Sequence, residues 1–142
     1  MPLSVSRTPS SRPHLIVALV TPFTPAGEVD RPSLQRLVAH LQAGGVEEFF
    51  VVGSTGEAPL LDAPARLAVI ETVRAAAPRG LVYAGISGTG HRDAIRNAQD
   101  AARAGTDFAV VMSPYFIALD QEQLAHFSIA IAALAILVAL DA

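Results

Sequence analysis

The chain has 142 residues, of which 51% are hydrophobic and 16% are charged, and its formal net charge is −3. This length suits one domain with a real core, and the composition is far from the charge-rich composition of disordered chains. All ten cationic residues are arginine, scattered along the sequence, so no basic face for nucleic acid is expected. Cysteine is absent, which excludes disulfides, thiolate metal sites and thiol nucleophiles and is typical of a cytoplasmic protein.

The two ends of the chain differ in character. Residues 1–13, MPLSVSRTPSSRP, lack the continuous apolar segment of a secretory signal and predict a flexible tail, so the predicted domain covers 14–142. Near the other end, the run from Ile129 to Leu140 is strongly apolar but well short of the roughly 20 residues that a membrane span needs. We therefore expect a buried helix or strand there, and no membrane partner.

The first strand and helix are predicted by residues 14–45. HLIVALV, residues 14–20, is the near-continuous apolar run of a parallel strand that is covered on both faces. Asp30 is placed to cap a helix, and Pro32 fits its first turn. Leucine and valine then recur at helical spacing until Gly44 and Gly45 end the pattern.

This unit repeats along the chain. Further strands are predicted at 48–53, 81–86 and 107–112, with helices opened by Asp62, running over 92–104, and opening near Gln121. Alternating units with buried strands predict a parallel α/β sheet. Both an open doubly wound sheet and the first half of a (β/α)8 barrel satisfy the pattern, and LAILVAL, residues 134–140, is compatible with a fifth strand.

The most informative motif is GSTGE, residues 53–57, which follows the second predicted strand. Ligands of parallel α/β proteins bind at the carboxyl ends of the strands. Gly53 and Gly56 allow the backbone N–H groups to turn inward, and Ser54 and Thr55 add hydroxyl donors, so the loop can hold a small carboxylate. A helix-capping turn, in which a hydroxyl satisfies loop amides, explains the same spacing.

Several motifs together resemble one family. IVALVTPFTPAGEVD, VVGSTGEAPLLD, YAGISGTG and VVMSPYF occur in the order and at the spacing of the dihydrodipicolinate synthase and N-acetylneuraminate lyase family, over about residues 15–127. The resemblance implies a (β/α)8 barrel, of which this chain is the N-terminal half. It also implies a class I aldolase-type lyase that binds pyruvate or another 2-oxo acid as a Schiff base, without a separate cofactor, and that commonly forms tetramers.

The resemblance assigns roles to individual positions. Ser54 and Thr55 match the paired hydroxyl residues that hold the carboxylate of the keto acid, and Ser54 also matches a position in a proton relay. Gly53 and Gly56 match the glycines that shape this loop. Tyr115 matches an aromatic residue that lies near a subunit interface in relatives, and the resemblance also makes it a candidate catalytic residue.

Two departures from the family pattern bear on activity. The position after Tyr115 often carries a relay tyrosine in relatives, but here it is Phe116, whose ring has no proton to pass. The family's Schiff-base lysine lies on strand 6, and these 142 residues contain no lysine. Because an iminium requires an amine, no other side chain replaces it.

Other candidate residues carry weaker signals. The histidines, His14, His40, His91 and His126, lack metal-ligand spacing, so no metal site is expected. We interpret Glu57 as orienting the GSTGE loop by accepting amide hydrogen bonds, with a solvent-facing role as the alternative. GISGTG lacks the spacing of a dinucleotide fingerprint.

Three interpretations of function remain open from sequence. The chain is the N-terminal part of a lyase and inactive alone; or it is a half barrel that binds a keto acid and pairs with another half through its open edges. The third is a truncated or frameshifted gene product with an apolar tail that favours aggregation.

Overall fold

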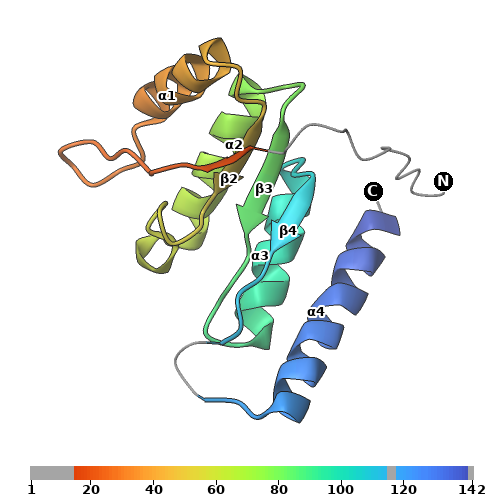
Figure 1. Cartoon of the computed structure of the whole chain (residues 1–142). Coiled ribbons are helices and arrows are strands. Elements are labelled where there is room, and N and C mark those ends of the chain that lie inside the picture. Colours follow the sequence, from red (N-terminus) through yellow and green to blue (C-terminus); the bar gives the residue numbers. More distant parts are fainter. Residues whose placement is uncertain (1–14, 115–117, 141–142) are drawn as a thin grey trace.

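Strands and helices alternate along the chain in the computed structural model, which describes residues 15–114 and 118–140 (Figure 1). The predicted tail, residues 1–13, lies outside the described residues. The elements, in chain order, are β1 (Ile16–Ala18), α1 (Arg31–Ala43), β2 (Glu48–Val51), the short 3-10 helix η1 (Ala58–Leu60), α2 (Ala63–Ala76), β3 (Leu81–Gly85), α3 (His91–Arg103), β4 (Phe108–Val110) and α4 (Gln121–Leu140). All four predicted strands form, each shorter than its apolar run.

The strands make one parallel sheet in the order β1-β2-β3-β4. One row across the sheet joins Ala18, Phe50, Tyr83 and Phe108, because these residues are successive register partners. Neighbouring strands are therefore consecutive in sequence, and α1, α2 and α3 are the crossover helices between them. The predicted parallel α/β sheet is confirmed.

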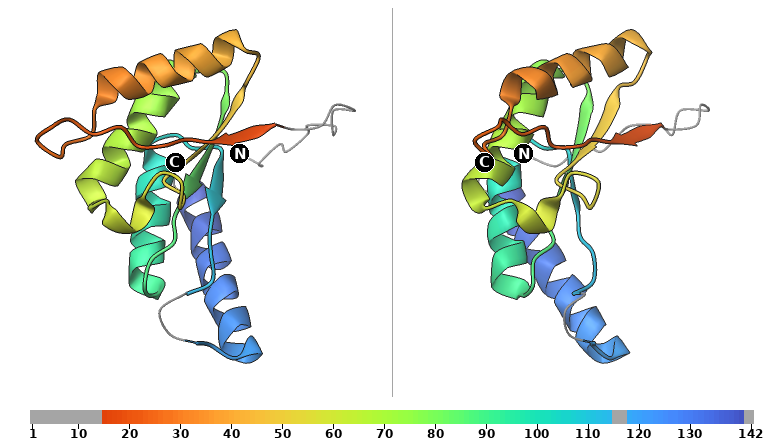
Figure 2. Two further views of the ribbon diagram at one scale, coloured as in Figure 1. Left: turned by 60° about the vertical axis from the view of Figure 1, so that its left-hand side comes forward. Right: turned by 90° about the vertical axis from the view of Figure 1, so that its left-hand side faces the viewer.

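The two faces of the sheet are unequally covered. Helices α1, α2 and α3 lie along one face (Figure 2), where Phe49, Val51, Val82 and Ala84 are fully buried. The alternate residues point to the opposite face, as period-2 strands require. Among the described residues no element covers that face.

Aspartates fix the starts of three helices. Asp30 accepts a hydrogen bond from the backbone N–H of Ser33 at 3.0 Å, and Asp62 accepts one from Ala65 at 2.8 Å. Asp120 and Gln123 form a reciprocal capping box ahead of α4, at 2.8 and 3.0 Å. The hydroxyl of Ser33 also donates to Asp30, and this bond, followed by the amide bond, lowers the pKa of the Asp30 carboxyl below its ordinary value.

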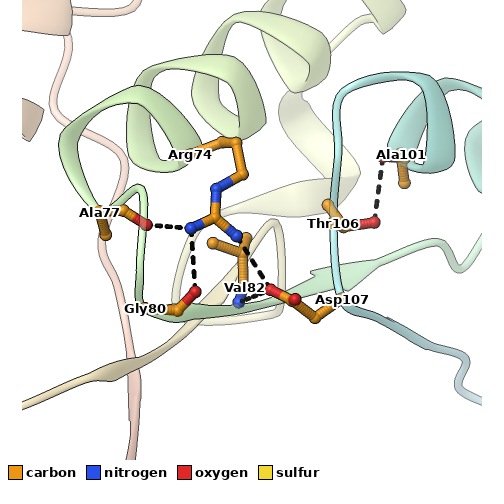
Figure 3. A network of polar contacts seen from close by, with 7 residues as sticks. All are labelled: Arg74, Ala77, Gly80, Val82, Ala101, Thr106 and Asp107. Atoms are coloured by element: carbon orange, nitrogen blue, oxygen red, sulfur yellow. Dashed lines mark hydrogen bonds and ion pairs between the residues drawn. The ribbon is translucent and has the colours of Figure 1, made fainter. Parts of the chain in front are cut away.

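A polar network closes the amino ends of β3 and β4 (Figure 3). The Arg74 guanidinium, at the end of α2, donates to the carbonyls of Ala77 and Gly80 and pairs with Asp107 at 3.0 Å. Asp107 also accepts the N–H of Val82 at 2.8 Å. One side chain thus ends a helix and joins the starts of two strands.

Helix α4 corrects one prediction. LAILVAL is not a fifth strand, because α4 continues to Leu140 and packs against α3. Phe127 and Ile131 are buried at this contact, whereas Ile129 is 65% exposed. Within the described ranges, no helix is long and apolar enough to cross a membrane.

Candidate functional site

The loop after β2 turns at both of its ends. Val52 and Glu57 have left-handed φ values of 56° and 57°, whereas Gly53 and Gly56 do not have positive φ. A β-branched residue in this region is a genuine outlier, and such strain is maintained only by surrounding contacts. The left-handed turns thus occur at the residues beside the glycines, so positive φ is not the reason for either glycine.

The glycines of this region provide room instead. A Cβ on Gly56 would lie 3.1 Å from the Leu19 carbonyl oxygen, and one on Gly53 would lie 2.7 Å from the Phe50 ring. The closest approach is at Gly85, the last residue of β3, where a Cβ would lie only 2.0 Å from the Val52 carbonyl oxygen. The turn at Val52 thus rests directly on the backbone of the neighbouring strand.

Two further contacts hold the loop to its neighbours. The buried hydroxyl of Thr21, beyond the end of β1, donates to the Gly56 carbonyl at 2.8 Å. The guanidinium of Arg66, in α2, donates to the carbonyls of Ala58 at 3.1 Å and Gly85 at 2.8 Å. Arg66 therefore ties the end of the loop to the end of β3. Sequence reasoning missed this residue, because its acceptors are backbone carbonyls that no motif marks.

The loop after β3 is anchored in the same way. Asn97, in α3, donates to the carbonyls of Ile86 and Ser87 at 3.3 and 3.2 Å, and the Ser87 hydroxyl accepts the N–H of Met112 at 2.8 Å. The turn that contains GISGTG is therefore joined to the exit of β4. The loop after β3 is thus held by α3 through Asn97 and by the segment after β4 through Met112.

Ser54 and Thr55 are exposed at the tip of the loop after β2. Within the described part of the chain, neither hydroxyl makes a hydrogen bond, and neither backbone N–H has a protein acceptor. The helix-capping alternative is therefore wrong: Asp62, not a loop hydroxyl, caps α2. Two hydroxyls and two amides remain available to an external acceptor at the carboxyl end of β2.

Glu57 does not orient this loop through its side chain. It is exposed, and among the described residues its carboxylate accepts no hydrogen bond. Its backbone matters instead, because its N–H donates to the Ser54 carbonyl at 3.1 Å and its left-handed conformation leads into η1. The predicted side-chain role is wrong.

A cavity of about 410 Å³ opens beside the loop. Its walls come from the loops after β2, β3 and β4 and from the first turns of α2 and α3. Gly53, Ser54 and Arg66 line it, together with Asp93 and Arg96, which form an ion pair at 2.8 Å. Thr55 and Gly56 lie on the same loop but do not line the cavity. Both charge signs are present in its walls.

Other predicted candidates lie apart from this loop. Tyr115 and Phe116 are outside the described residues, as is His14. His40 lies in α1, and His91 at the start of α3 packs against the ring of Phe127 in α4, with centroids 4.8 Å apart. Over residues 15–114 and 118–140, no three histidine, aspartate or glutamate side chains gather in a way that would hold a metal ion.

Comparison with known proteins gives one consistent match. The family model of the dihydrodipicolinate synthetase family matches residues 12–139. The 4-hydroxy-tetrahydrodipicolinate synthase of Synechococcus sp. (strain CC9902) is 36% identical over 129 residues, covering 89% of this chain and 43% of that protein. The enzyme of the same name from Synechococcus sp. (strain CC9311) is 40% identical over 125 residues, with 87% and 41% covered.

Solved structures agree in fold. YagE, a prophage protein of the dihydrodipicolinic acid synthase family from E. coli K12 in complex with pyruvate, superposes with a TM-score of 0.80 at 32% identity, covering 84% of this chain and 40% of YagE. Dihydrodipicolinate synthase from Aquifex aeolicus gives 0.80 at 34% identity, with 84% and 41% covered. The chain thus spans about two fifths of its relatives' length, and its fold is the N-terminal half of a (β/α)8 barrel, as predicted.

Proposed function

Because the chain belongs to the dihydrodipicolinate synthetase family, we propose that the loop after β2 binds the carboxylate of a small 2-oxo acid such as pyruvate. In this proposal Ser54 and Thr55 donate their hydroxyl and backbone hydrogens to the carboxylate oxygens. Gly53 and Gly56 keep the loop close to its supports. Schiff-base lyases bind a keto acid through its carboxylate and its carbonyl carbon. In this proposal the chain supplies the part of such a site that binds the carboxylate.

The availability of the donors at Ser54 and Thr55 carries the proposal. Both hydroxyls and both amides lack protein acceptors within the described residues, although they lie on a loop whose backbone is held by Thr21, Arg66 and Gly85. A carboxylate that accepts several such hydrogen bonds is held without a cationic side chain. The pyruvate complex of YagE, a relative in fold and family, supports the choice of ligand.

The chemical step is a separate matter from binding. A class I aldolase mechanism needs an unprotonated side-chain amine to attack the keto carbon and expel water as the imine forms. The 142 residues contain no lysine. We therefore propose that this chain, by itself, binds the keto acid without activating it.

Isothermal titration of pyruvate into the 142-residue chain tests the binding step. We expect weak but saturable binding, and at least a tenfold weaker affinity for Ser54→Ala, since a hydrogen bond to a charged group contributes about 1.5–3 kcal/mol. Ser128→Ala is the matched control, because its hydroxyl only donates back to the Leu124 carbonyl within α4. Equal affinity in all three proteins would refute the role of the loop.

Borohydride reduction in the presence of pyruvate tests the chemical step. We expect no stable mass increase at an internal position of the chain. Peptide mapping distinguishes a side-chain adduct from one at the N-terminal amine. An adduct within residues 15–142 would contradict the proposal that binding occurs without activation.

A further inference from the structure

Two threonine side chains are the polar groups that the described part of the chain buries: Thr21 is 4% exposed and Thr72 is 3% exposed. The Thr72 hydroxyl donates at 2.6 Å to the Ala68 carbonyl one turn earlier in α2, a bond that stays within the helix. The Thr21 hydroxyl instead donates at 2.8 Å to the Gly56 carbonyl, 35 residues further along the chain. Of the two buried hydroxyls, that of Thr21 therefore acts on the loop after β2.

Thr21 is held in place by the backbone on both of its sides. Before it, the N–H of Leu19 donates to the Phe50 carbonyl at 2.9 Å and extends the pairing of β1 with β2. After it, the carbonyl of Pro22 accepts the N–H of Asp30 at 2.8 Å. A proline also restricts the backbone of the residue before it, and a branched threonine side chain has few χ1 rotamers. The hydroxyl is therefore presented to the loop after β2 from a fixed point.

The Gly56 carbonyl begins a chain of hydrogen bonds that ends at a proposed ligand donor. This carbonyl and the N–H of Glu57 belong to one peptide unit, and that N–H donates to the Ser54 carbonyl at 3.1 Å. The Ser54 carbonyl in turn shares a peptide unit with the N–H of Thr55. Because a planar trans peptide directs its C=O and its N–H to opposite sides, each bond fixes the direction of the next donor. The direction of the Thr55 N–H therefore follows from where the Gly56 carbonyl is held.

The N–H of Ser54, the other proposed amide donor, is oriented by a second route, which is local. The Gly53 carbonyl, on the same peptide unit, accepts the N–H of Ala58 at 3.1 Å. The Glu57 carbonyl, which shares a peptide unit with that N–H, accepts the N–H of Leu60 in η1 at 2.8 Å. The two amide donors thus have separate supports, one from the exit of β1 and one from η1.

We propose that Thr21 is a positioning residue for the keto acid, an inference that rests on the proposed function of the loop. Its hydroxyl holds the Gly56 carbonyl so that the Thr55 N–H, two peptide units away, faces the carboxylate of the ligand. Within residues 15–114 and 118–140 the Gly56 carbonyl accepts no other hydrogen bond, so no second donor fixes this peptide unit when the hydroxyl is removed. Thr21 acts through the backbone and does not itself contact the ligand.

Variants at the two buried threonines separate positioning from stability. Thr21→Val keeps the branched shape and removes the hydroxyl, whereas Thr21→Ser keeps the hydroxyl. Thr72→Val removes the other buried hydroxyl and is the matched control. Circular dichroism and urea titration establish that each variant is folded before ligand is added. A role in stability alone would lower the free energy of unfolding of Thr21→Val but leave the pyruvate affinity of the folded protein unchanged.

Calorimetry with pyruvate measures the effect on the ligand. We expect Thr21→Val to bind at least about fivefold more weakly than wild type, because a misdirected N–H loses part of a hydrogen bond to a charged group. Thr21→Ser and Thr72→Val should bind within about twofold of wild type, because both keep the bond to the Gly56 carbonyl. Equal affinity of Thr21→Val and wild type, an equal loss in Thr72→Val, or no recovery in Thr21→Ser would each overturn the proposal.

Amide hydrogen exchange without ligand tests the hydrogen-bond chain itself. The Glu57 N–H should exchange at least about threefold faster in Thr21→Val than in wild type or Thr21→Ser, because local opening of the loop exposes it. The reference is the N–H of Val46, which donates to the Leu41 carbonyl before β2 and reports any general loss of stability. A wild type that binds no pyruvate refutes the proposed function. An unchanged Glu57 rate in Thr21→Val, or a Glu57 N–H that exchanges in wild type as fast as in an unfolded chain, refutes positioning by Thr21 whatever the affinity.

Discussion

Gly85→Ala is expected to displace the loop after β2 without altering any proposed ligand-binding residue. The new Cβ would lie 2.0 Å from the Val52 carbonyl oxygen and 2.8 Å from its carbonyl carbon, and Cβ atoms essentially never approach other heavy atoms below 3.0 Å. The strand and the turn must therefore separate by about 1 Å, from 2.0 to 3.0 Å. Both are backbone, so no flexible side chain can absorb the shift.

The cost follows from the close packing of this point. Overpacking a well-packed site destabilises by about 1–3 kcal/mol. Val52 is 2% exposed and already has a left-handed backbone, so it has little freedom to move aside. We expect Gly85→Ala to lower the free energy of unfolding by about 1–3 kcal/mol, which corresponds to a melting temperature lower by roughly 3–12 °C.

The assay is chemical denaturation of wild type and variant, followed by calorimetry with pyruvate on the folded variant. A loop moved by about 1 Å loses hydrogen-bond geometry, so binding should weaken at least about tenfold. Gly90→Ser is the control, because a Cβ at Gly90 meets nothing within 4 Å and serine suits its N-cap position. If Gly85→Ala unfolds like wild type, then the Val52 carbonyl does not rest on Gly85, and the account of the loop's support is refuted.

Two further predictions concern stability. Asp107→Asn should lower the free energy of unfolding, measured by urea titration, by about 1–2 kcal/mol, because Asp107 pairs with Arg74 and accepts the Val82 N–H. Asp100→Asn, at an exposed pair with Arg103, is the control and should lower it by less than about 1 kcal/mol. Equal losses in the two variants would show that the network in Figure 3 stabilises the fold no more than an exposed ion pair does. The lowered pKa of Asp30 adds stability that is present above the ordinary aspartate pKa and lost as pH falls through the folded value. The free energy of unfolding, measured against pH, should therefore fall less steeply on the acid side for Asp30→Asn than for wild type. Parallel pH profiles of the two proteins would contradict the assigned cap.

The sequence was most informative where structure is decided locally. Asp30 and Asp62 cap helices as predicted, because a capping side chain and its amide are three residues apart and both are visible in the pattern. The end of the chain was ambiguous for the opposite reason. Leucine, isoleucine and valine in LAILVAL suit a buried strand or a helix alike, and the alanines together with the capping box at Asp120 favour the helix that forms.

The site was predictable in position but not in construction. GSTGE marks a loop at the carboxyl end of a strand, yet the reasons for its glycines differ from those that its letters suggest. Room beside Leu19 and Phe50, rather than positive φ, explains Gly56 and Gly53. The support from Arg66 depends on carbonyls 8 and 19 residues away along the chain, and only the folded chain brings them together.

The origin of these supports bears on what the chain can do alone. The loop after β2 is held by the exit of β1 through Thr21, by the end of β3 through Gly85, and by α2 through Arg66. Every one of these elements precedes β4, so the geometry of the Ser54 and Thr55 donors is set by contacts that the chain makes within itself. Binding and chemistry are then expected to separate, because the donors need only these supports whereas the imine needs an amine that the 142 residues lack.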